Sequence, residues 1–217
     1  MESKLFTPVT FGPLTLRNRT IRSAAFESMC PGNAPSDMLL NYHRSVAAGG
    51  IGMTTVAYAA VTRSGLSFDR QLWMRPEIIP GLRRLTDAVH AEGAAAGIQL
   101  GHCGNMSHKS ICGCTPVGAS GGFNLYSPTF VRGLRADELP ELARAYGRSV
   151  NLAREAGFDA VEIHAGHGYL ISQFLSPATN HRKDEFGGSL QNRMRFMDMV
   201  MEEVMKAAGS DMAGGGG

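Results

Sequence analysis

Four apolar segments, each followed by an amphipathic helical pattern, recur along the chain and limit the folds that it can adopt. The segments cover residues 20–26, 52–57, 95–100 and 158–163. They are nearly uninterrupted by polar residues, as is typical of strands buried on both faces of a parallel sheet. Strands that alternate with helices in this way predict an α/β protein, in which helices cover at least one face of the sheet.

The segments between these strands carry signals of helix ends. Ser36 suits the cap of a helix with Asp37 in its first turn, and Pro76 suits the start of the next helix, which ends at Gly93. Apolar residues recur at three- and four-residue spacing in the later helical segments. The expected helices cover residues 36–49, 76–93, 139–157 and 190–208, and a glycine-rich insertion covers 101–135.

The two ends of the chain depart from this repeating pattern. Residues 6–16 alternate apolar and polar side chains around Gly12-Pro13, which predicts a short hairpin before the main fold. Residues 209–217 end in four consecutive glycines. We expect this segment to be a glycine-rich disordered tail that cannot form a strand.

Two architectures fit alternating strands and helices. A dinucleotide-binding sheet is disfavoured because no Gly-x-Gly-x-x-Gly sequence links the first strand to the first helix. A parallel (β/α) barrel of the TIM type is favoured instead, and such barrels have eight strand-helix units in about 250 residues. Residues 1–208 are therefore expected to form the N-terminal half of a barrel, with about four of the eight units present.

The charge balance points to a small-molecule partner. The chain has 21 basic and 19 acidic residues, a net charge of +2, and so lacks the excess charge expected of a protein that binds nucleic acid or an anionic membrane. No window approaches the roughly 18 apolar residues of a membrane span, and the charged start has no signal-peptide pattern. A cytoplasmic location is expected.

The four cysteines give little support to a metal site. Cys112 and Cys114 are separated by one residue, whereas the cysteines of zinc sites usually have a two-residue gap. We expect free thiols, as in a reducing compartment, and no bound metal.

Polar side chains follow the fourth strand, at the edge where (β/α) barrels place their active sites. His164 and His167 leave the strand three residues apart and could present N–H donors to one oxygen of a substrate. Tyr169 has a reference pKa near 10 and keeps its proton at neutral pH, so that it could protonate a carbon that has become enolate-like. The segment therefore predicts an oxyanion-binding site with a proton donor.

Other interpretations of the same residues remain open. His164 and His167 could be metal ligands, although the nearby acidic residue, Glu162, is expected on the other side of the strand. The two histidines could also be purely structural. Tyr169 alone would normally be interpreted as a half-buried ring with a satisfied hydroxyl.

A long motif favours the catalytic interpretation. The segment His164-Ala-Gly-His-Gly-Tyr-Leu170 is followed by Phe174-Leu-Ser-Pro177, and then by runs over 180–189 and 192–196. Together they resemble the Old Yellow Enzyme family of FMN-dependent oxidoreductases. The resemblance extends over residues 4–208 and includes Leu5-Phe-Thr-Pro8, Leu16-Arg-Asn-Arg19, Gly97-Ile-Gln-Leu-Gly-His102 and Ala156-Gly-Phe-Asp159.

The resemblance implies an enzyme that reduces activated alkenes, namely α,β-unsaturated carbonyl or nitro compounds, using FMN reduced by NADPH or NADH. It implies that His164 and His167 grip the substrate oxygen and that Tyr169 is the proton donor. The positions expected to line the flavin are Ser23, Ala24, Phe26, Ala60 and Gln99.

The sequence also departs from that family in two ways. Phe26 and Glu27 stand near the flavin, where the family often has Met, Cys or Thr, so both residues are expected to change its surroundings. The four units are expected to be only half of a barrel, which predicts a homo-oligomer or a complementary C-terminal half-barrel as partner. The alternatives are a non-catalytic half-barrel that acts at most as a binding module and, more remotely, a metal-dependent hydrolase.

Overall fold

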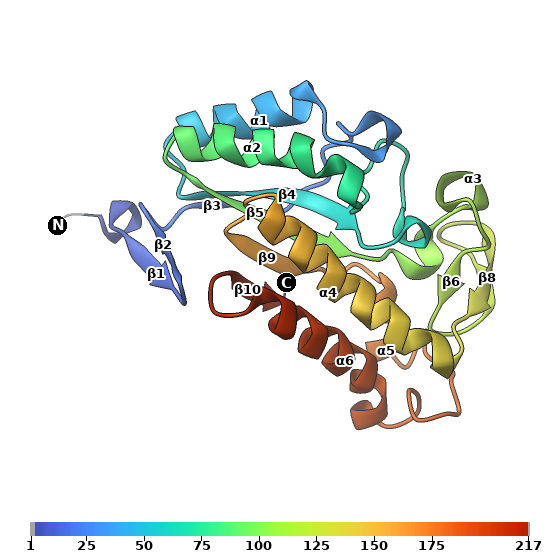
Figure 1. Cartoon of the computed structure of the whole chain (residues 1–217). Coiled ribbons are helices and arrows are strands. Elements are labelled where there is room, and N and C mark those ends of the chain that lie inside the picture. The colour runs from blue at the N-terminus through green and yellow to red at the C-terminus, as the bar shows by residue number, and fades with distance from the viewer. Residues whose placement is uncertain (1–2, 217) are drawn as a thin grey trace.

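The computed structural model of the chain describes residues 3–216. Its centre is a five-stranded parallel sheet, in which the strands lie side by side in the order of the chain (Figure 1). The strands are β3 (Ile21–Arg22), β4 (Met53–Ala60), β5 (Ala95–Gly101), β9 (Ala160–Ile163) and β10 (Ala213–Gly216).

This strand order distinguishes the two architectures. A doubly wound sheet reverses its strand order at a switch point and carries helices on both faces. Here the order has no reversal, so right-handed connections place successive helices on one face of the sheet. The sheet is therefore part of a (β/α) barrel, and the predicted fold class is confirmed.

The covering helices follow the strands in turn, and α4 packs on α6 and α1 on α2 (Figure 1). The Ser36 side chain caps the first of them by accepting a hydrogen bond from the Leu39 N–H at 3.2 Å. The apolar faces of the helices are buried against the strands, with Leu82, Tyr146 and Phe196 at 0% exposure. The helices are α1 (Asp37–Ala48), α2 (Ile79–Ala91), α4 (Leu139–Glu155) and α6 (Leu190–Ala208).

Two predictions about strands were wrong. The first strand was expected over residues 20–26, but only Ile21 and Arg22 pair with β4, because the chain then turns out of the ladder. The tail was expected to be disordered and unable to form a strand, yet β10 pairs in parallel with β9. The hydrogen bonds between strands are made by backbone groups, which glycine also has. Glycines can therefore form a strand where the preceding helix places them beside a strand edge that is unpaired.

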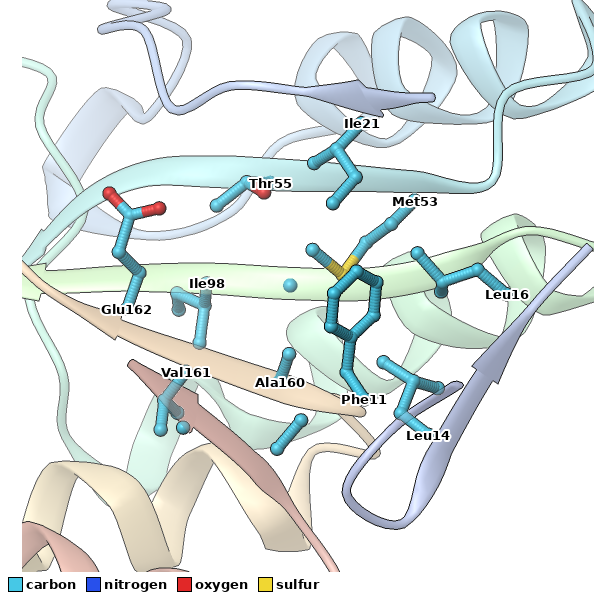
Figure 2. A pocket seen from close by; sticks show the side chains of 13 residues that line it. Phe11, Leu14, Leu16, Ile21, Met53, Thr55, Ile98, Ala160, Val161 and Glu162 are labelled. Atoms are coloured by element: carbon cyan, nitrogen blue, oxygen red, sulfur yellow. The ribbon is translucent and has the colours of Figure 1, made fainter. Parts of the chain in front are cut away.

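The predicted hairpin is present before the sheet, with β1 (Val9–Phe11) and β2 (Leu14–Leu16) paired antiparallel around Gly12-Pro13. It lies against the amino-terminal part of the sheet, on the face opposite the helices. Phe11 and Leu14 of the hairpin line an apolar cavity together with Met53 and Ile98 of the sheet (Figure 2). The inner face of the sheet is thus partly covered at this end.

The insertion between β5 and α4 has structure of its own. It contains a short helix, α3 (Lys109–Cys112), and three strands, β6 (Val117–Gly118), β7 (Gly122–Asn124) and β8 (Thr129–Gly133). A further short helix, α5 (Leu170–Leu175), follows the carboxyl end of β9. None of the helices within residues 3–216 has both the length and the apolar character needed to cross a bilayer.

Candidate functional site

A tight turn carries the candidate catalytic side chains away from the carboxyl end of β9. His167 and Gly168 have φ values of 53° and 68°, in the left-handed region, and the Tyr169 N–H donates to the Gly166 carbonyl at 3.0 Å. A left-handed residue other than glycine is uncommon, and such residues cluster at functional sites. The turn brings His164, His167 and Tyr169 together.

The two histidine rings meet edge to face, with 4.9 Å between their centroids and 90° between their planes. The Nε2 of His164 and the Nδ1 of His167 are 3.0 Å apart and share a hydrogen bond. The Gly166 N–H donates to the Nδ1 of His164 at 3.3 Å, so the ring proton of His164 is on Nε2. The Nε2 of His164 and the Nδ1 of His167 therefore face each other above the turn.

Burial keeps His164 neutral. The residue is 5% exposed, and burial, followed by the adjacent His167, lowers its pKa from 6.5 to about 4. At neutral pH the imidazole is therefore a neutral hydrogen-bond donor through Nε2 and carries no charge.

Tyr169 lies half-buried against the same ring. Its centroid is 4.8 Å from that of His164 and 5.3 Å from that of Tyr58. Burial is the largest of the effects on its hydroxyl and raises its pKa, so Tyr169 keeps its proton at neutral pH. The geometry therefore places a neutral His164 donor, the His167 ring and a protonated phenol together at one end of the sheet.

Gln99 lies below this group, on the inner face of the sheet. Its side-chain amide donates to the carboxylate of Glu162, the residue beside it on β9. The expectation that Glu162 faces away from the histidines was wrong, because residues two apart on a strand point to the same side. Glu162 and Thr55 line the same open face in Figure 2. Gln99 retains an amide N–H and a carbonyl oxygen for a ligand.

The other residues that were predicted to line the flavin differ in their exposure. Ser23 and Phe26 are exposed in the segment after β3, and the Phe26 ring stacks on that of Phe68 with 4.9 Å between centroids. Ala24 is partly buried. Ala60 is 0% exposed, because the segment after β4 folds over it and its N–H donates to the Leu72 carbonyl. Its side chain therefore supports the wall of the site and offers no open surface.

Glu27 is not beside the open face, contrary to expectation. Its side chain is 4% exposed and lies 2.8 Å from the Arg22 guanidinium and 3.4 Å from the His43 ring. It also accepts a hydrogen bond from the Ala57 N–H at 3.3 Å. A carboxylate in this position ties the segment after β3 to β4 and α1.

Two residues of the site, Tyr58 and Glu162, were not predicted from the sequence. Tyr58 packs against both His164 and Tyr169 and donates to the Gly65 carbonyl at 3.0 Å. A shift in register between Val56 and Ala59 changes the face on which the later residues of β4 lie. No signal in the sequence marks this bulge, whereas strict alternation from His164 would have identified Glu162.

A buried histidine beside the site makes stability depend on pH. His102 is 1% exposed, accepts from the Gly104 N–H at 3.0 Å, and burial lowers its pKa to about 4. The unfolded chain binds a proton near pH 6.5, so stability falls as the pH drops from about 6.5 to 4, by up to about 3 kcal/mol from this group. His102→Gln should reduce that loss, measured by urea unfolding at pH 7 and 4.5. His181→Gln, at an exposed position, should not.

The fold and the site together define a (β/α)-barrel protein with a binding site at the carboxyl ends of its strands. The chain belongs to the NADH:flavin oxidoreductase / NADH oxidase family, whose profile matches residues 4–215. The resemblance predicted from the motifs is confirmed. The family is named for flavin-dependent oxidoreductases that use NADH, and one similar relative is an NADPH dehydrogenase.

Individual relatives agree with this assignment. The chain is 44% identical over 209 residues to a 4,4'-dithiodibutanoate disulfide reductase of Rhodococcus erythropolis, covering 96% of this chain and 52% of the relative. It is 37% identical over 209 residues to an NADPH dehydrogenase of Bacillus subtilis, covering 94% and 60%. The chain thus spans roughly half the length of these relatives.

Solved structures give the same result. The Old Yellow Enzyme homologue from Zymomonas mobilis matches with a TM-score of 0.90 and 30% identity, over 98% of this chain and 62% of that one. A 2-naphthoyl-CoA reductase complex matches with a TM-score of 0.93 and 28% identity, over 98% and 35%. The fold of the chain is therefore that of a part of these longer proteins.

Proposed function

We propose that the protein supplies the substrate-gripping part of an FMN-dependent oxidoreductase that reduces activated alkenes, with NADPH or NADH as reductant. The observation that carries the proposal is the meeting of His164, His167 and Tyr169 at the carboxyl end of β9, above Gln99. Two imidazole rings and a phenol suit a substrate in which an oxygen gains charge while a nearby carbon gains a proton.

The residues of the inner face fit FMN. The free amide N–H and oxygen of Gln99 form a donor-acceptor pair that matches the pyrimidine edge of the isoalloxazine ring. Ser23 and Ala24 follow β3, which is separated from the strand of Gln99 by β4. Gly101 lies between Tyr58 and His164, where a Cβ would be 3.0 Å and 3.1 Å from their side chains, so the aromatic wall can close over the end of β5. When bound, FMN would supply the hydride.

The histidines would hold the substrate oxygen in the following way. His164 donates through Nε2, the atom that now contacts His167. An oxygen inserted between the rings accepts a hydrogen bond from this N–H, which frees the Nδ1 of His167 to take up a proton by a change of tautomer and to donate as well. The Tyr169 hydroxyl then protonates the carbon next to the activating group. His164 stays neutral throughout, so its N–H holds the oxygen as a dipole that is already in place.

The remainder of the barrel would complete the site. Within residues 3–216, β3 and β10 each pair with one strand only, and the face of the sheet opposite the helices is open beyond the hairpin. The loops that hold a cofactor phosphate in barrels usually follow the seventh and eighth strands. We therefore propose that further strands, from the same polypeptide or from a partner, close the barrel and complete FMN binding.

The test is an anaerobic assay of the purified protein with FMN, NADPH and 2-cyclohexenone, in which the loss of the enone absorbance is followed. We expect enone consumption that depends on both FMN and NADPH, and we expect His164→Ala to weaken binding of a phenol at the flavin. A protein that binds FMN and oxidises NADPH but leaves the enone unchanged would contradict the proposed substrate class.

An organic disulfide is the second substrate to offer in that assay. The 44% identical relative from Rhodococcus erythropolis is named for the reduction of 4,4'-dithiodibutanoate. Thiol release that requires NADPH and FMN, with no enone consumption, would favour this substrate for the same site.

A further inference from the structure

A pair of thiols lies outside the candidate site, on the insertion between β5 and α4. Cys112 is the last residue of α3, and Cys114 follows after one glycine. Their sulfur atoms are 3.8 Å apart, and both residues are free cysteines. Cys112 is 2% exposed, whereas Cys114 is exposed to solvent. One thiol of the pair is thus accessible to a reagent, and the other lies directly behind it.

The turn between the two thiols depends on glycine. Gly113 has a φ of 78° and its N–H donates to the Lys109 carbonyl at 2.9 Å, which ends α3 in a left-handed cap. A Cβ at this position would lie 3.1 Å from the Arg63 guanidinium carbon, in a backbone conformation that other residues rarely adopt. This conformation brings the side chains of Cys112 and Cys114 to the same side of the turn.

The surroundings of Cys114 differ from those of the other cysteines. Burial raises the pKa of Cys30 and Cys103 to about 12, so both remain inert thiols in the core. Burial and the adjacent Cys112 also raise the pKa of Cys114, but Arg132 and Arg63 oppose this by favouring its thiolate. Cys114 is therefore both the exposed thiol and one with cations beside it.

We propose that Cys112 and Cys114 form a redox-active dithiol that exchanges with low-molecular-weight disulfides. Cys114 is the attacking thiol because it is exposed, and Cys112 is the resolving thiol because it lies behind Cys114 at 3.8 Å. A disulfide needs a sulfur-sulfur distance of about 2.05 Å, which rotation of the exposed Cys114 side chain can provide.

The exchange balances as two displacements. The Cys114 thiolate attacks one sulfur of the small disulfide, whose S–S bond breaks and releases one thiolate. The Cys112 thiolate then attacks the Cys114 sulfur, forms the Cys112–Cys114 bond and releases the second small thiolate. The two protein thiols give up two protons and two electrons, and the small disulfide becomes two thiols.

The reaction requires none of the residues assigned to the flavin. Cys114 lines a cleft with Thr62, Ser64 and Arg132, whereas His167 borders a different cleft, beside the β7–β8 hairpin. Dithiol exchange is therefore expected without FMN and without NADPH, as a single stoichiometric event. A failure of dithiol exchange would not count against the proposed alkene reduction. A failure of alkene reduction would likewise not count against dithiol exchange.

The test uses the reduced native protein and the aromatic disulfide DTNB at pH 8, without FMN or NADPH. A dithiol releases about two equivalents of the coloured thiol, retains none on the protein, and loses about 2 Da in intact mass. Peptide mapping should locate the new bond between Cys112 and Cys114. In denaturant, Cys30 and Cys103 should also react. A native protein that keeps one coloured thiol as a stable adduct would overturn the proposal without any variant.

Two variants separate the roles of the thiols. Cys112→Ser should release about one equivalent and keep a mixed disulfide, because the resolving thiol is gone. Cys114→Ser should slow the first release at least about tenfold, because Cys112 is buried. Circular dichroism checks that each variant is folded. Equal behaviour of the two folded variants would refute the assignment of the attacking and resolving thiols.

Discussion

Tyr169→Phe is expected to slow alkene reduction by a factor of about 10² to 10⁴ in the flavin-loaded protein, because the proposed donor of the proton to the substrate carbon is removed. The rate at which NADPH bleaches the flavin should not change, since that step needs no proton from Tyr169. Anaerobic stopped-flow measurements of the two half-reactions give both rates. A slower alkene half-reaction with an unchanged rate of flavin reduction would identify the Tyr169 hydroxyl as the proton donor.

Tyr58→Phe is the matched control for that experiment. Tyr58 packs against Tyr169 and His164, but its hydroxyl is committed to Gly65 and Ser67, at 3.0 Å each. We expect this variant to change the alkene half-reaction by less than about tenfold. If Tyr169→Phe slowed both half-reactions equally, the residue would be positioning the flavin, and its role as proton donor would be wrong.

Glu27→Ala is expected to lower the free energy of unfolding by about 1–3 kcal/mol, because it leaves a mostly buried cation without its carboxylate. The Arg22 guanidinium, with a side chain 15% exposed, lies 2.8 Å from the carboxylate. Urea unfolding followed by circular dichroism measures the loss. The effect should appear as a lower midpoint with an unchanged slope.

Glu77→Ala is the control, because Glu77 is 74% exposed and lies 3.9 Å from Arg75. Its loss should change the free energy of unfolding by less than about 1 kcal/mol. A similarly small effect for Glu27→Ala would mean that Arg22 reaches water once the carboxylate is gone. In that case Glu27 would not be what holds the segment after β3 in place.

Much of the fold could be predicted from the sequence, because strand and helix periods and helix caps are local signals. Ser36 caps α1 as expected, and the hairpin turns at Gly12-Pro13. The chemical identity of the site followed from a motif over residues 164–169, where strand end and turn are continuous in the sequence. The convergence of His164, His167 and Tyr169 was therefore foreseeable.

The rest depended on contacts between distant segments. The position of Glu27 is set by Arg22 and by His43 on α1, and neither contact leaves a periodic signal. The burial of Ala60 results from the segment that folds over β4, and the bulge in β4 brings Tyr58 to the site. Strand β10 exists because β9 offers it an unpaired edge, which overrides the low strand propensity of glycine.

The backbone at position 167 restricts which side chains evolution can place there. With a φ of 53°, the position disfavours β-branched and bulky residues and admits mainly glycine, asparagine, aspartate and histidine at low cost. Among these, only histidine and asparagine carry a neutral N–H donor. Relatives that keep this turn and still grip an oxygen should therefore alternate between these two residues at the position of His167, and a relative with any other residue there should have lost the second donor.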